Sequence, residues 1–154
     1  MSTLAHPLPD ASRAPDFARA LAYLGLLPFV LPTATLLLGP AGWHAAALDA
    51  LRAYGAVILS FLGAVHWGLG LREPALAQRW HVFGWGVLPA LTGWIALLLP
   101  VGGGLTLLIG GYVLQYGADR HATLLDALPL WYERLRLRLS VVMLGCLVLA
   151  RVAP

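Results

Sequence analysis

The chain has 154 residues, of which 60% are hydrophobic and 11% are charged, and its mean hydropathy is +0.79. A soluble domain carries about 25% charged residues, so this composition excludes a water-soluble globule and favours a lipid environment. The net charge is +3, and every basic side chain other than histidine is arginine. These arginines flank apolar runs, which indicates membrane topology rather than nucleic-acid binding.

The N-terminal region, residues 1–16, is polar and contains three prolines. We expect it to form a flexible tail. The first apolar run, 17–38, is longer than the apolar core of a signal peptide and has no clear cleavage site after it, so we interpret it as a retained span. Pro28 and Pro32 lie inside this run and predict kinks in its helix.

Four further apolar runs follow the first. A short amphipathic stretch, 44–52, leads into the second of the five predicted spans, which are 17–38, 53–71, 81–99, 102–118 and 130–150. The last span is polar in its first turns, so a half-inserted final helix, leaving four true spans, is the alternative. The sequence therefore predicts an all-α, polytopic membrane bundle of about five transmembrane helices, with residues 17–154 forming one domain.

The arginines are distributed unevenly between the two sides that a five-span topology creates. One side holds Arg13, Arg19, Arg72, Arg79, Arg120, Arg134, Arg136 and Arg138, and the other holds Arg52 and Arg151. Positively charged loops stay on the cytoplasmic or matrix side. This predicts an N-terminus on that side, a C-terminus opposite, and arginines of the last helix that reach lipid phosphates.

Two spans carry small and polar residues on one helical face. In the second span Ser60, His66 and Trp67 share a face with small residues, and in the fourth span Gln115 and Asp119 recur at four-residue spacing. Small residues let membrane helices approach closely, so both faces are expected to point into the bundle. Ionisable residues inside a membrane are candidates for function.

These positions predict a polar pocket near the positive side, in which His66 and Asp119 face each other. The core candidates are Ser60, His66, Trp67, Gln115 and Asp119, and the candidate neighbours are His81, Tyr112, Tyr116, His121, Trp131, Tyr132 and Arg136. The alternative is structural: the histidine bonds to a neighbouring helix, and the carboxylate caps a loop or pairs with Arg120 or Arg136. Tyrosine and tryptophan near the boundary are typical of membrane anchors.

No cofactor or metal is predicted. Haem ligation by His66 and His81 is disfavoured because the second histidine lies close to the surface. A metal site of His66, His121 and Asp119 lacks a known ligand spacing. Cys146 is the single cysteine, so no disulfide forms within the chain, and it is expected to be a packing residue. The sequence contains no nucleotide-binding loop or nucleophile elbow.

The stretch Tyr54–Gly68, which reads YGAVILSFLGAVHWG, resembles the signature of the transmembrane protein 69-like family of small bacterial and mitochondrial membrane proteins of unknown function. Further similar stretches are Gly25-Leu26-Leu27-Pro28-Phe29, Pro89, Trp94, Asp119, Pro129-Leu130-Trp131-Tyr132 and Leu135-Arg136. The resemblance covers nearly the whole chain. It implies a multi-pass protein of the bacterial inner membrane, or of the mitochondrial inner membrane in a eukaryote, and supplies no reaction or catalytic residue.

Function is predicted only in outline. The short loops leave no room for a soluble catalytic domain, which favours a non-enzymatic accessory or scaffold protein of an energy-transducing membrane. The alternative is a protein that binds or transports a proton, quinone, lipid headgroup or small anion through the polar pocket. The expected partners are the lipid bilayer and other membrane subunits or a second copy, with no nucleic acid.

Overall fold

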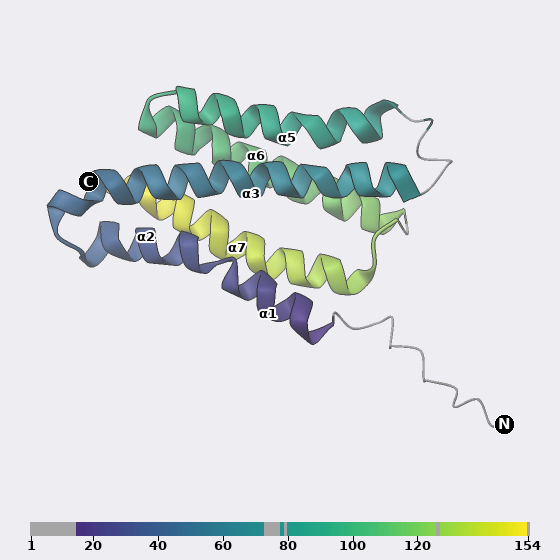
Figure 1. Cartoon of the computed structure of the whole chain (residues 1–154), viewed down its shortest axis with the longest axis horizontal. Helices are drawn as coiled ribbons and strands as arrows, with labels where there is room; N and C mark the ends of the chain where they lie inside the picture. The colour runs from purple at the N-terminus through teal and green to yellow at the C-terminus, as the bar shows by residue number, and fades with distance from the viewer. Residues whose placement is uncertain (1–14, 73–77, 79, 126, 154) are drawn as a thin grey trace.

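The computed structural model describes residues 15–72, 78, 80–125 and 127–153, and the described residues contain helices but no strands (Figure 1). The helices are α1 (Asp16–Leu24), α2 (Leu27–Leu38), the short 3-10 helix η1 (Ala41–Trp43), α3 (His44–Arg72), α5 (Trp80–Leu98), α6 (Val101–Leu124) and α7 (Leu130–Val152). The greater part of the predicted tail and of the loop 72–80 lies outside the described residues.

The helices form five rods, of which α1 and α2 together make the first, and successive rods run in opposite directions (Figure 1). Three helical stretches among the described residues are long and apolar enough to cross a membrane: Asp16–Leu38, Ala41–Arg72 and Trp80–Leu98. Helices α6 and α7 have 24 and 23 residues, which at about 1.5 Å per residue also exceeds a hydrocarbon core of about 30 Å. The predicted helical membrane bundle is confirmed.

The antiparallel order places α1 and the end of α7 at opposite ends of the bundle (Figure 1). A reporter fused after the last residue is therefore expected to lie across the membrane from the N-terminus. In a bacterial host, alkaline phosphatase at that position should be active and green fluorescent protein should be dark. The reverse pattern would contradict a five-span topology with a cytoplasmic N-terminus.

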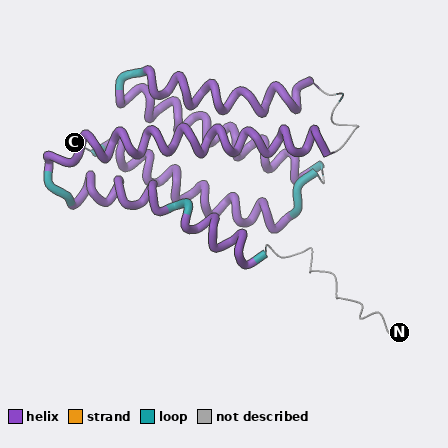
Figure 2. The backbone as a smooth tube through the Cα atoms, viewed as in Figure 1, coloured by secondary structure: helices purple, strands orange, loops and turns teal. Residues whose placement is uncertain are grey.

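The first rod is interrupted at Gly25 and Leu26, where Figure 2 shows a loop segment between α1 and α2. Pro28 follows in the first turn of α2 and has no N–H for the preceding turn, which explains the interruption. Tyr54 of α3 donates its hydroxyl to the Gly25 carbonyl at 3.0 Å and so satisfies a backbone group at the break. Pro32, in contrast, lies inside α2 without interrupting it.

Helix α3 starts at His44, so the predicted amphipathic stretch 44–52 and the following span are one continuous helix. Arg52, predicted as a boundary residue, is instead buried against the end of α5. Its Nη2 donates to the carbonyls of Ala96 at 2.9 Å, Leu97 at 3.3 Å and Leu99 at 2.8 Å. The last carbonyls of a helix lack backbone partners and carry partial negative charge, so a buried arginine is stabilised there.

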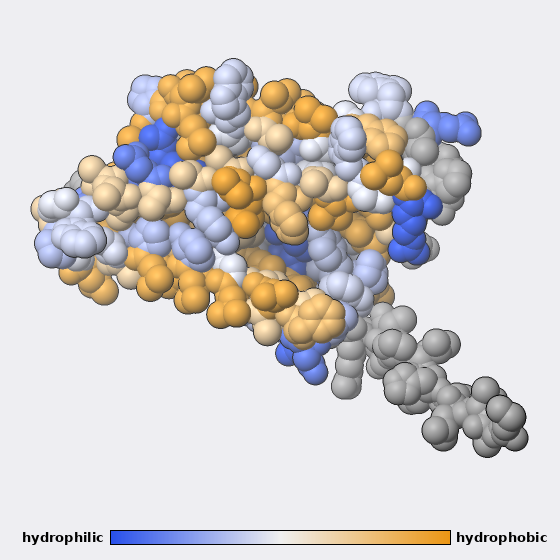
Figure 3. Space-filling view, in the orientation of Figure 1, coloured by the Kyte–Doolittle hydropathy of each residue, from blue (hydrophilic) through white to orange (hydrophobic). Residues whose placement is uncertain are grey.

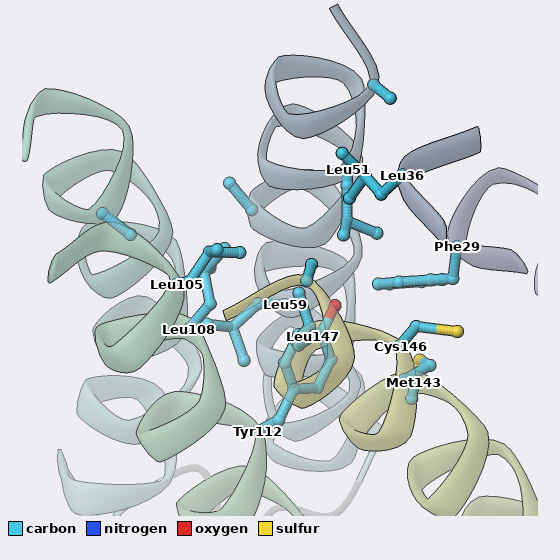
Figure 4. Close-up of a cluster of buried hydrophobic side chains, with 14 of the residues drawn as sticks. Phe29, Leu36, Leu51, Leu59, Leu105, Leu108, Tyr112, Met143, Cys146 and Leu147 are labelled. Atoms are coloured by element: carbon cyan, nitrogen blue, oxygen red, sulfur yellow. The ribbon is translucent and has the colours of Figure 1, made fainter. Parts of the chain in front are cut away.

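A continuous apolar core joins α2, α3, α6 and α7 (Figure 4). Its larger members are Phe29, Leu36, Leu51, Leu59, Leu105, Leu108, Tyr112, Met143, Cys146 and Leu147. Phe29 packs edge-on against Tyr54, with ring centroids 5.1 Å apart, and against Tyr112 at 6.2 Å. Cys146 is buried among these side chains, as a packing residue would be.

Helices α3 and α5 approach each other closely through glycine. A Cβ atom on Gly63 would lie 2.7 Å from the carbonyl oxygen of Gly86 and 3.0 Å from Pro89. A Cβ atom on Gly93 would lie 2.9 Å from the carbonyl oxygen of Ala56. Backbone rather than a movable side chain occupies this space, so these glycines set the distance between the two helices.

The outer surface of the bundle is largely apolar. Figure 3 shows hydrophobic side chains spread along the length of the helices on the visible face. Many large apolar side chains are more than half exposed, among them Leu38 at 88% and Phe61 at 66%. A surface of this kind is stable against lipid tails rather than against water.

Candidate functional site

A buried ion pair joins α6 to α7. Nε of Arg136 donates to Oδ2 of Asp119 at 2.8 Å, and the two residues are 3% and 1% exposed. Buried charges are tolerated in a membrane protein when they pair and face the interior of the bundle. The other polar side chains of the site are arranged around this ion pair.

Gln115, one helical turn before the carboxylate on α6, extends the pair toward two other helices. Its Nε2 donates to Oδ1 of Asp119 at 2.8 Å and to the Leu62 carbonyl of α3 at 3.3 Å. Its Oε1 accepts a hydrogen bond from Nε1 of Trp85 on α5 at 3.1 Å. The amide therefore links α3, α5 and α6 and uses both of its polar ends.

His66 completes the arrangement from α3. Its Nδ1 lies 3.9 Å from Oδ1 of Asp119 and 3.5 Å from Nε2 of Gln115, and the side chain is buried. The structure thus brings together the two residues that the sequence placed face to face. We call His66, Trp85, Gln115, Asp119 and Arg136 the polar cluster.

Three polar atoms beside the cluster are buried and have no hydrogen-bond partner among the described residues. They are Oη of Tyr132, Nη2 of Arg136 and Oγ of Ser140. These residues follow one another at four-residue spacing, so they lie on one face of α7. A buried polar group without a partner is unfavourable, so these three atoms are the unsatisfied part of the site.

Two of the predicted core candidates lie outside the cluster. Ser60 donates back to the Ala56 carbonyl of its own helix at 2.9 Å. Trp67 is 43% exposed, and its Nε1 donates to the Phe83 carbonyl of α5 at 2.9 Å. Ser60 thus bonds within its own helix, and Trp67 contributes to the packing of α3 against α5. Position on a helical face was not enough to separate them from His66.

The predicted neighbours also divide into two groups. Tyr112 is fully buried and donates to the Gly55 carbonyl at 2.8 Å, one turn deeper than Gln115. His81 and His121 are exposed, and Tyr116 is half-buried. The rings of Trp131 and Tyr132 lie edge-on with their centroids 6.1 Å apart. Oη of Tyr132 is buried without a hydrogen-bond partner among the described residues.

The structure corrects the prediction that Arg136 reaches lipid phosphates together with its neighbours. Arg134 and Arg138 are exposed, whereas Arg136 is buried against Asp119. At about 100° per residue, an arginine two positions away points to nearly the opposite side of the helix. Pairing of this arginine with the carboxylate was the structural alternative, and the structure contains that pair.

The cluster offers few groups for a metal or haem. Within the described residues, no three histidine, cysteine or acidic side chains gather as metal ligands. His66 is buried inside the bundle, whereas His81 is exposed on its surface. Sequence reasoning missed Trp85 and Ser140 as parts of the site. The signal that could have found Trp85 is its predicted depth in the membrane, which matches that of Gln115. No feature of the sequence pointed to Ser140.

With this geometry established, the chain can be compared with known proteins. The model of a family described as "Protein of unknown function (DUF3429)" matches residues 14–152. The chain belongs to this family. Transmembrane protein 69 of Xenopus tropicalis is 36% identical to this family member in an alignment of 151 positions that covers 92% of the chain and 57% of the relative. The chain thus spans little more than half of that relative's length.

These comparisons confirm the resemblance predicted from the Tyr54–Gly68 stretch. The relative's name and the apolar helices together identify this DUF3429 member as a membrane protein. No solved structure matches the chain. The polar cluster is therefore described here from its own geometry.

Proposed function

We propose that the chain is a non-enzymatic accessory or scaffold protein of an energy-transducing membrane, the inner membrane of a bacterium or a mitochondrion. The observation that carries this proposal is a face of α3 that no other described helix covers. Ala64 and Gly68 are exposed four residues apart, and a Cβ atom on Gly68 would meet no heavy atom within 4 Å. Small residues at this spacing are typical of helix–helix contacts in lipid.

The interior of the bundle supports the same proposal. We call the end of the bundle that carries Arg19, Arg72, Arg120 and Arg134 the arginine-rich end. The polar cluster lies in the half of the bundle nearer to it. Phe29, Leu51 and Leu105 belong to the apolar core that fills the other half. Asp119 and Arg136 pair with each other inside the bundle. The surfaces that remain for a partner are therefore the outer, apolar faces of the helices.

The proposal is tested by purification from the native host in mild detergent. We expect a stoichiometric membrane subunit to co-purify with the wild-type chain and with Gly145→Leu, and to be lost from Gly68→Leu. Both glycines are exposed and have open space around a Cβ, so both variants should keep the wild-type melting temperature. Isolation of the chain alone, or equal partner retention in both variants, would contradict the proposal.

A second function is favoured by the three buried atoms of Tyr132, Arg136 and Ser140 that lack partners. In this view the polar cluster binds a small hydrogen-bonding ligand, such as a quinone or an anion, from the arginine-rich side. Mass spectrometry of the purified protein should then detect the ligand, and His66→Ala should lose it while keeping the fold. If His66→Ala unfolds, a structural role for the histidine is supported instead.

A further inference from the structure

A groove of about 490 Å³ opens on the bundle surface, away from the polar cluster. It runs along α6 between Gly102 and Leu114, with Thr92 of α5 and Arg151 of α7 in its wall. Gly103 and Gly110 are exposed, and a Cβ on Gly110 would meet no heavy atom within 4 Å. The hollow therefore exists because α6 carries glycine rather than a larger residue at several positions along this line.

The groove has one cationic end. Nε of Arg151 donates to Oγ1 of Thr106 at 3.2 Å, and its guanidinium carbon lies 3.6 Å from where a Cβ on Gly102 would be. Among the described residues, no carboxylate lies within 4 Å of Arg151, and no hydrogen bond uses its two terminal nitrogens. The hydroxyls of Thr92 and Thr106 donate to carbonyls of their own helices.

The depth of the groove matches one leaflet. Gly102 and Arg151 lie at the end of the bundle opposite the arginine-rich end, and Leu114 lies about 18 Å further along α6 at 1.5 Å per residue. Half of a bilayer's hydrocarbon core is about 15 Å. The guanidinium of Arg151 therefore lies at the level of the lipid headgroups, and the groove extends from it toward the bilayer midplane.

The size of the groove and its cation together indicate the kind of occupant. A site of 490 Å³ lies within the range of small-molecule pockets, about 300–1,000 Å³. The two terminal guanidinium nitrogens, for which the described part of the chain supplies no partner, suit a phosphate, which arginine binds by charge-assisted hydrogen bonds.

We propose that this groove binds a phospholipid of the leaflet opposite the arginine-rich side. One acyl chain lies along the glycines of α6, and the phosphate contacts Arg151. Arg52, the other arginine at this end, donates to the carbonyls of α5 instead. The site is independent of the scaffold function proposed above, because it uses neither Gly68 nor the polar cluster.

The test is native mass spectrometry of delipidated protein titrated with phosphatidylglycerol, with diacylglycerol as the phosphate-free probe. Arg151→Gln and Gly110→Leu should each lower phosphatidylglycerol affinity at least tenfold. The matched controls are Arg138→Gln, an exposed arginine in the first half of α7, and Gly117→Leu, an open glycine of α6 outside the groove. Both controls should bind as the wild type does.

Three results would overturn the proposal. Equal affinity for phosphatidylglycerol and diacylglycerol would show that the phosphate is not recognised. Equal binding by all four variants would place the lipid elsewhere. Loss of a dimer in Gly110→Leu, with lipid binding unchanged, would identify a second copy of the chain as the occupant of the groove.

Discussion

Arg136→Leu is expected to lower the free energy of unfolding by about 3–5 kcal/mol, because it leaves the carboxylate of Asp119 buried without its ion-pair partner. Gln115 and His66 remain near the carboxylate, but neither supplies a permanent positive charge. The change should be visible as a lower midpoint in unfolding by sodium dodecyl sulfate, followed by circular dichroism in mixed micelles.

The matched control for this prediction is Arg138→Leu, which removes an exposed arginine from the same helix. It is expected to change stability by less than about 0.5 kcal/mol. The double variant Asp119→Leu/Arg136→Leu should be more stable than Arg136→Leu, since no unpaired charge stays buried. If the two arginine variants unfold at the same midpoint, the ion pair does not stabilise the bundle.

Gly63→Ala is expected to be the next most damaging change, lowering the free energy of unfolding by about 1–3 kcal/mol. The new methyl group would lie 2.7 Å from the Gly86 carbonyl and 3.0 Å from Pro89, so α3 and α5 must move apart. Gly93→Ala meets the Ala56 backbone at 2.9 Å and should behave in the same way. The same unfolding experiment measures both variants.

Gly68→Ala is the control on the same helix, because its methyl group meets no heavy atom within 4 Å. Alanine favours a helix over glycine by roughly 0.5–1 kcal/mol, so this control should be neutral or slightly stabilised. The comparison of Gly63→Ala with Gly68→Ala separates the destabilising effect of a close helix contact from the stabilising effect of helix propensity. Equal stability of the two variants would show that α3 and α5 can accommodate the extra methyl group without loss of stability.

Much of the polar cluster could be predicted because two helices have distinct faces. His66 on α3 and the pair Gln115 and Asp119 on α6 share their faces with small residues, and such faces turn inward in lipid. Membrane topology then placed all three at a similar depth. The small-residue face indicates which side of each helix points into the bundle, and the topology indicates the depth of each residue in the membrane. Together they predict that the three side chains lie close to one another.

The rest of the site depends on contacts between distant segments. Near the start of α7 arginine occupies every second position, at Arg134, Arg136 and Arg138. This spacing does not match the helical repeat of about 3.6 residues, so the sequence does not show which arginine faces the bundle interior. Arg52 looks like a boundary residue until the end of α5 lies beside it. Trp85 joins the cluster only because α5 presents it to Gln115.

The buried ion pair has a consequence for biogenesis. Arginine opposes the insertion of a single helix, by about 2.5–3.5 kcal/mol at the helix centre and by less toward its ends. Helix α7 carries four arginines and is not among the three stretches apolar enough to span alone. Asp119 is synthesised before Arg136, on the preceding helix. We therefore expect α6 and α7 to leave the translocon together as a neutralised hairpin, after the α3 and α5 hairpin has already partitioned into lipid.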